Sequence, residues 1–146
     1  MIEISTYLRD AAGTLVNVEE ASFSPPNPKY IEGAIHLRIN DIDILDQSMW
    51  DLVDQLWCYI ADMIDGLEKT GYAQTYFPDQ PIVLSFKRLG RRAVLVRSVG
   101  RTVRGSTIDE DCLISSLKKA ALDFYARISL LAPVGYPLQI ARLNRM

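Results

Sequence analysis

Residues 30–69 read YIEGAIHLRINDIDILDQSMWDLVDQLWCYIADMIDGLEK and contain the change of pattern that decides the fold. From Tyr30 to Ile39, apolar and polar residues alternate with the period of a half-buried β-strand. Asn40 and Asp41 tolerate the left-handed backbone of a tight turn. We therefore expect Ile42 to Ile44 to return as the second strand of a hairpin.

From Gln47 to about Lys69, apolar residues recur every three or four positions, which predicts an amphipathic helix. Asp46 or Ser48 is expected to cap its N-terminus, because Ser48 and Asp51 have the spacing of a capping box. Gly71 is placed to end the helix. The polar face of this predicted helix is strongly acidic and carries Asp51, Asp54, Asp62, Asp65 and Glu68.

The flanking segments add further strands. Ile2 to Arg9 alternates like a half-buried strand, and Thr14 to Phe23 predicts a second, less regular one. After the helix, Ile82 to Lys87 and Ala93 to Val99 are predicted to form a hairpin, followed by a third strand within Arg101 to Ser106.

A second long helix is predicted from Thr107 to Ala132, where Thr107 and Glu110 have capping-box spacing and Pro133 ends the apolar period. The tail after it is expected to form one or two helical turns. The order strands, helix, strands, helix predicts an α+β fold in a single domain, residues 1–146. We expect a mostly antiparallel sheet of about six to seven strands, with two main helices packed on one face.

The composition is that of a folded cytoplasmic domain. The chain has 146 residues, of which 49% are hydrophobic and 23% charged, so it can bury a core without a metal or disulfide. Cys58 and Cys112 both fall in predicted helices and are expected to remain free thiols. The first residues do not resemble a signal peptide, and no apolar run approaches the roughly 20 residues of a membrane span.

The motifs of common enzyme classes are absent from the sequence. His36 is the single histidine and lies on the polar side of a predicted strand. Neither Cys58 nor Cys112 lies in a local reactive-cysteine pattern. Neither a dinucleotide-binding glycine motif nor a Walker motif occurs. The sequence therefore predicts a non-enzymatic protein without a cofactor.

A cluster of aspartates raises the question of a metal site. Asp41, Asp43 and Asp46 are close in sequence, but no glycine or bidentate glutamate follows at the spacing of a calcium loop. A hairpin turn and a helix cap account for all three residues. We therefore expect no metal site.

The charges are sorted along the chain, although the formal net charge is only −2. Acidic residues dominate between Asp41 and Asp79, and aromatic residues follow the acidic helix. Such a surface could engage a basic protein partner, with aromatic side chains as anchors. The residues predicted to bind the partner are Asp51, Asp54, Asp62, Asp65, Tyr72, Tyr76 and Phe77.

The segment from Lys87 to Arg104 contains only basic charges and supports an alternative. It could bind nucleic acid or another anion, although it lacks aromatic residues for base stacking. A third hypothesis is that the acidic and basic surfaces meet in a homodimer. The residues predicted to bind an anion are Arg88, Arg91, Arg92, Arg97, Arg101 and Arg104.

Three stretches carry a resemblance to known proteins: GAIHLRINDIDILD at 33–46, WDLVDQLW at 50–57 and TYFPDQP at 75–81. Together they resemble small stand-alone bacterial proteins among the candidate immunity proteins of polymorphic toxin systems. The resemblance covers about residues 30 to 125. It implies a cytoplasmic protein that binds and neutralises a toxin domain, with an acidic surface suited to a nuclease that has a basic active site.

Overall fold

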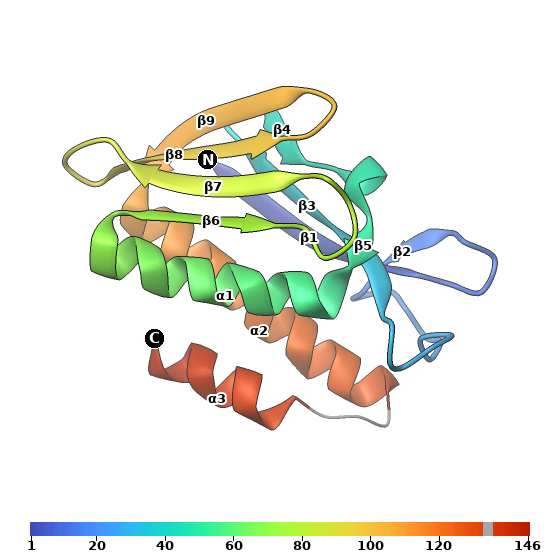
Figure 1. Ribbon diagram of the computed structural model, residues 1–146. Coiled ribbons are helices and arrows are strands. Elements are labelled where there is room, and N and C mark those ends of the chain that lie inside the picture. The colour runs from blue at the N-terminus through green and yellow to red at the C-terminus, as the bar shows by residue number, and fades with distance from the viewer. Residues whose placement is uncertain (133–135) are drawn as a thin grey trace.

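The computed structural model describes residues 1–132 and 136–146, which form two antiparallel sheets and three helices (Figure 1). The α+β class is confirmed. The expected single sheet of six to seven strands is instead divided, with nine strands in two sheets within the described residues. The first long helix separates the two groups of strands in the sequence and packs against both of them.

The first sheet is built from the N-terminal strands in the order β2-β1-β3-β4, with β5 pairing to β3. The expected strand from Thr14 to Phe23 is only three residues long. It ends at Asn17, whose side chain accepts a hydrogen bond from Glu19 N and turns the chain out of the sheet. The bounds are β1 Ile2–Arg9, β2 Leu15–Asn17, β3 Glu32–Ile39, β4 Ile42–Leu45 and β5 Asp51–Leu52.

The hairpin between β3 and β4 forms as the sequence predicts. Asn40 and Asp41 adopt φ angles of 50° and 66°, the left-handed conformation that asparagine and aspartate tolerate. The side chain of Asn40 also donates a hydrogen bond to Thr107 O at 2.9 Å. The turn therefore ties the first sheet to the second.

Helix α1 (Val53–Thr70) begins later than the periodicity predicts. Gln47–Met49 forms a separate 3₁₀ turn, η1, whose N-cap is Asp46, with its carboxylate accepting from Ser48 N. Asp51 then enters β5 opposite Gly33, so the predicted capping box is wrong. The C-terminal prediction is confirmed: Gly71 has a φ of 76° and its N–H donates to Leu67 O.

The second sheet has the order β6-β7-β8-β9 and leads into α2. The predicted cap of α2 is wrong, because Thr107 pairs with Leu95 inside β9 and Asp109 is the capping residue, accepting from Cys112 N at 3.0 Å. Pro133, predicted to end this helix, lies outside the described residues. The bounds are β6 Tyr72–Tyr76, β7 Val83–Arg88, β8 Ala93–Val99, β9 Val103–Asp109, α2 Glu110–Leu131 and α3 Pro137–Arg145.

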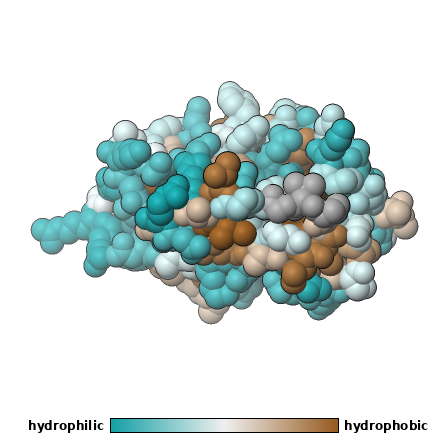
Figure 2. All heavy atoms as spheres, turned by 90° about the horizontal axis from the view of Figure 1, so that it is seen from below, coloured by the Kyte–Doolittle hydropathy of each residue, from teal (hydrophilic) through white to brown (hydrophobic). Residues whose placement is uncertain are grey.

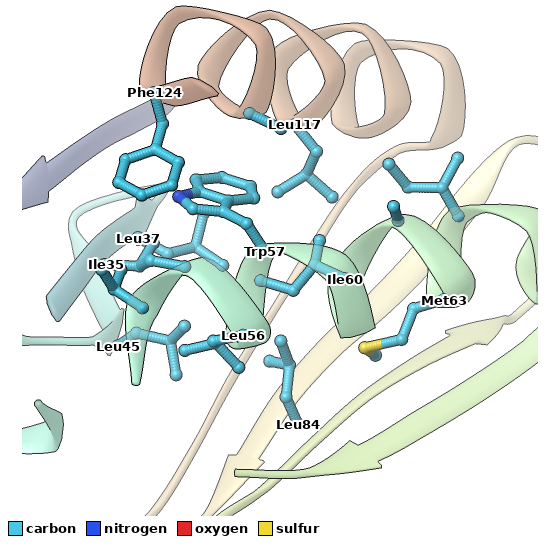
Figure 3. Close-up of a cluster of buried hydrophobic side chains, with 14 of the residues drawn as sticks. Ile35, Leu37, Leu45, Leu56, Trp57, Ile60, Met63, Leu84, Leu117 and Phe124 are labelled. Carbon is cyan, nitrogen blue, oxygen red and sulfur yellow. The ribbon is translucent and has the colours of Figure 1, made fainter. Parts of the chain in front are cut away.

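One continuous core joins both sheets to the helices (Figure 3). At its centre, Trp57 of α1 is fully buried, and its indole N–H donates to Thr6 Oγ1 of β1 at 3.1 Å. The two sheets are joined directly where the buried Ser98 Oγ of β8 donates to Ile44 O of β4 at 2.7 Å. Further fully buried side chains include Ile35, Leu37, Leu45, Leu84, Phe86, Leu117 and Phe124.

None of the helices in the described residues is both long and apolar enough to cross a membrane.

We predict that Gly33→Ala destabilises the protein by about 1–3 kcal/mol. A Cβ at Gly33 would lie 2.1 Å from Tyr7 O and 2.9 Å from Val53 Cγ1. Because the nearer atom belongs to the backbone of β1, no change of rotamer relieves the overlap. Urea-induced unfolding measures the loss of stability.

The matched control is Gly90→Ala. A Cβ at Gly90 would meet nothing within 4 Å, so its midpoint of unfolding should stay close to that of the wild type. Equal midpoints for the two variants would contradict the close packing of β1, β3 and α1.

Candidate functional site

The aspartates predicted to form one exposed binding surface are separated by the fold. Asp51 is only 3% exposed, and its carboxylate accepts hydrogen bonds from Asp79 N at 3.0 Å and Gln80 N at 2.9 Å. It therefore holds the connection between β6 and β7 in place. Its predicted role in contacting a partner is corrected, because the side chain is buried.

Asp54 faces the protein interior between the helices. Its Oδ2 accepts from the hydroxyl of Tyr136 at 3.2 Å, while Oδ1 is buried and has no hydrogen-bond partner in the described residues. Burial raises the pKa of this carboxyl above its ordinary value. Nearby, the Tyr125 hydroxyl lies 3.0 Å from Cys58 Sγ and donates to the backbone carbonyl of Asp54 at 2.9 Å.

Asp62 and Asp65 pair with the C-terminal helix of the same chain. Arg142 of α3 lies 2.6 Å from the Asp62 carboxylate and 3.6 Å from that of Asp65. Lys69, which lies on α1 like Asp65, approaches the Asp65 carboxylate at 3.5 Å. The predicted acidic surface is therefore covered in part by a basic segment that the chain itself supplies.

The helical side of the molecule is mainly hydrophilic, with apolar patches between the polar side chains (Figure 2). Leu130 of α2 and Leu138 of α3 are 78% and 80% exposed. Both lie close in sequence to the residues that the structure does not describe, so they support no binding site.

Half of the predicted basic site is used in structural ion pairs. Arg88 contacts Glu110 at 2.7 Å and lowers the pKa of that carboxyl, and Arg92 pairs with Asp111. Arg104 contacts Asp46 at 2.6 Å, which joins the acidic and basic segments of the sequence. The charge complementarity that a homodimer would need is thus partly satisfied within one chain.

The other predicted cations remain available. Arg91, Arg97 and Arg101 are exposed and, like Lys87, form no ion pair within the described residues. Arg91 lies in the connection between β7 and β8, and Arg101 lies in the connection between β8 and β9. Unpaired cations therefore extend from one end of β8 to the other.

The predicted aromatic anchors also separate. Tyr72 and Tyr76 are 47% and 66% exposed on β6, whereas Phe77 is 4% exposed and belongs to the core. The prediction for Phe77 is corrected, because its backbone N–H bonds to Ile82 O and the side chain closes over the core.

The strand register places both tyrosines and two of the free cations on one face of the second sheet, called here the outer face. The helices pack on the opposite face, where Leu84, Phe86 and Val96 are fully buried. The outer face includes three full cross-strand rows: Tyr72, Lys87, Leu95 and Thr107; Gln74, Ser85, Arg97 and Gly105; and Tyr76, Val83, Val99 and Val103. The pair of Ala93 and Asp109 extends this face at one end, where Asp109 is exposed.

The β6–β7 and β8–β9 connections approach β5 and η1 at one end of the molecule (Figure 1). Side chains from these segments line a cleft. This aromatic cleft has a volume of about 590 Å³, and residues lining it include Arg9, Tyr30, Glu32, Trp50, Gln80 and Arg101. The guanidinium of Arg9 lies 4.5 Å from the centre of the Trp50 ring and 2.6 Å from the Glu32 carboxylate. Tyr30 and Trp50 are 58% and 40% exposed.

Arg9, Tyr30 and Trp50 are among the cleft residues that the sequence predictions missed. Trp50 falls within the segment predicted to be helical, but it lies in the extended segment between η1 and β5. A usable signal was the run of prolines from Pro25 to Pro28, which keeps the chain before Tyr30 outside the sheet. Only Asp51 and Arg101 among the predicted site residues line the cleft.

The residues considered for chemistry make structural contacts. His36 Nε2 lies 2.9 Å from Asp43 Oδ1, and Arg38 approaches the same carboxylate at 3.8 Å. Cys58 and Cys112 are free thiols. The described part of the chain contains no cluster of histidine, cysteine and carboxylate groups that could hold a metal ion.

We predict that Asp54→Asn raises the melting temperature at neutral pH. Because burial raises the pKa of Asp54 in the folded state, the native protein binds its proton more tightly than the unfolded chain does. The protonated Asp54 side chain therefore contributes its full stabilisation of the folded state below the ordinary aspartate pKa. This contribution is lost as the pH rises through the pKa of the folded state. Asparagine is never charged, and it keeps an acceptor for Tyr136.

Melting temperatures measured from acidic to neutral pH test this assignment. The gain should appear at neutral pH and vanish in acid. Asp62→Asn serves as control, because it removes an exposed, paired charge from the same helix and should give no gain. A difference between Asp54→Asn and wild type that does not depend on pH would contradict a buried, charged Asp54.

We predict that Asp51→Ala lowers the free energy of unfolding by about 3 kcal/mol, because two part-buried backbone N–H groups lose their carboxylate acceptor. Urea-induced unfolding measures the change. Asp79→Ala is the control, since the side chain of Asp79 is exposed and only its backbone N–H takes part in the contact. Equal stability of the two variants would show that Asp51 does not fix the connection between β6 and β7.

Comparison with models of known protein families, with curated proteins and with solved structures found no match. The resemblance of residues 30 to 125 to candidate immunity proteins therefore stays a prediction. The structure offers two candidate surfaces: the aromatic cleft, with charges of both signs, and the outer face, with cations and exposed tyrosines.

Proposed function

We propose that the protein is a cytoplasmic, non-enzymatic binding protein of the immunity type, which neutralises a bacterial toxin domain by forming a complex with it. The observation that carries the proposal is the composition of the aromatic cleft. Arg9, Tyr30, Trp50 and Arg101 line this one cleft, and tryptophan, tyrosine and arginine are the residues enriched at the energetic centres of protein interfaces.

The walls of the cleft are held in position before any partner arrives. Glu32 and the Trp50 ring fix the guanidinium of Arg9 from two directions. The buried carboxylate of Asp51 fixes the backbone of the β6–β7 connection, and the Gln80 side chain donates to the carbonyl of Trp50. Since these side chains are already ordered, a complex loses less conformational entropy when it forms.

The cleft replaces the acidic helix as the proposed contact surface. Asp51 and Asp54 are turned inward, and Asp62 and Asp65 pair with Arg142. The lining of the cleft contains Arg9 and Arg101 as well as Glu32 and Asp79. A partner matching it presents mixed charges and an apolar or aromatic side chain that fits between the rings.

The decisive experiment searches the neighbouring reading frames for a toxin-like C-terminal domain, co-expresses that domain with this protein and measures binding of the purified pair by titration calorimetry. We expect co-expression to restore growth and the two proteins to form a complex. The double variant Trp50→Ala/Arg101→Ala should bind at least about thirtyfold more weakly, which corresponds to about 2 kcal/mol, the lower bound for an interface hot spot.

The control variant is Leu89→Ala, which removes an exposed apolar side chain from the β7–β8 connection, at the opposite end of the second sheet. It should bind like the wild type. Failure to form a complex or to protect cells would contradict the immunity function. A complex that the cleft variant forms with unchanged affinity would contradict only the position of the interface.

A further inference from the structure

We propose that the outer face of the second sheet binds single-stranded nucleic acid. In this arrangement Lys87 and Arg97 contact phosphates, and the rings of Tyr72 and Tyr76 stack on unpaired bases. The proposal is independent of the immunity function, because it uses a different surface and a different class of ligand.

The first support is electrostatic. Lys87 and Arg97 are exposed in neighbouring rows of the outer face and form no ion pair within the described residues. Arg91 and Arg101 continue this line of charge beyond the two ends of β8. None of the twelve residues in the three full rows is acidic. The acid of this face, Asp109, lies at its end beside Ala93, where its side chain caps α2. Cations that form no ion pair and outnumber the acids of their face attract a polyanion, although the whole chain has a net charge of −2.

The arginines of the second sheet that form ion pairs lie on its other face. Arg88 of β7 and Arg104 of β9 extend from the inner face and meet Glu110 and Asp46. These two charges are therefore neutralised within the protein, whereas Lys87 and Arg97 on the outer face form no ion pair within the described residues. Strand alternation separates the two sets, since successive side chains point to opposite faces.

The second support is the position of the tyrosines. Tyr72 and Tyr76 lie on the same side of β6, about 13 Å apart along the strand. Tyr72 is oriented by its hydroxyl, which donates to Gln74 Oε1 at 2.8 Å. Two strand spacings, about 10 Å, separate β6 from Arg97 on β8, so one strand of nucleic acid can place phosphates on β8 and bases over β6.

The apolar side chains of the face fit the same ligand. Val99 and Val103 are 38% and 59% exposed in the row that contains Tyr76. They can contact the sugar and the edges of stacked bases without requiring a hydrogen-bond pattern. Stacking and cation contacts without base-specific hydrogen bonds are typical of proteins that bind single strands with little sequence preference. A duplex would hide the base faces from the tyrosines.

Fluorescence anisotropy with labelled oligothymidine and oligouridine of about twelve nucleotides tests the proposal. A duplex of the same length and inorganic polyphosphate serve as comparison ligands. We expect the single strands to bind most tightly at low ionic strength. Their affinity should fall with salt, with a logarithmic slope of about −0.7 for each phosphate contact.

Variants on the face separate stacking from charge. Tyr76→Ala or Tyr72→Ala should weaken binding about five- to 150-fold, since one stacked base contributes about 1–3 kcal/mol. Arg97→Gln should weaken binding and reduce the salt slope by about 0.7. The matched control is Arg38→Gln, which removes the same charge from the first sheet, where Arg38 lies beside Asp43, and should leave binding unchanged.

Circular dichroism confirms that each variant is folded before binding is compared. The absence of binding to either oligonucleotide at low ionic strength would overturn the proposal. Equal affinity for the duplex and the single strands would also overturn it. Equal affinity for polyphosphate would do the same if the tyrosine variants also bound the oligonucleotides like the wild type. Those outcomes would show that the face carries no stacking site for unpaired bases.

Discussion

Packing of one face of α1 against both sheets is the constraint on which the rest of the structure depends. Its tryptophan, Trp57, is fully buried and touches the first sheet through the hydrogen bond to Thr6, while Leu56 and Met63 of the same helix lie in the core shared with the second sheet. Because one helix supplies apolar side chains to both sheets, neither sheet can move without opening the core. The bond from Ser98 to Ile44 O makes the same connection on the side away from α1.

Both candidate surfaces follow from this arrangement. Since the helices pack on the inner face of the second sheet, its outer face has no covering element within the described residues. The aromatic cleft forms where the ends of the two sheets approach each other, and residues from β1, β5 and the β8–β9 connection line it. The buried carboxylate of Asp51 is the contact that keeps this end closed. The surfaces are therefore attached to rigid elements, as precise recognition requires.

Local signals in the sequence predicted what depends on neighbouring residues. The Asn40–Asp41 turn, the stop at Gly71 and the two long helices follow from backbone preference and periodicity. Periodicity indicates which polar side chains share one face of a helix. It does not indicate which groups those side chains contact in the folded protein. Asp51 and Asp62 belong to the same pattern, yet one binds backbone donors 28 residues away and the other binds Arg142. Trp50 and the tyrosines could be located only once the strand register was known.

Helix α3 of the same chain covers part of the acidic side of α1. Arg142 pairs with Asp62 and Asp65, and Tyr136 reaches Asp54 from the start of the same helix. A segment joined covalently to its site acts at an effective concentration on the order of millimolar. A basic peptide from solution would therefore have to displace a tethered segment before it could reach Asp62 and Asp65. The acidic face that suggests an open binding surface in the sequence is thus partly occupied in the fold.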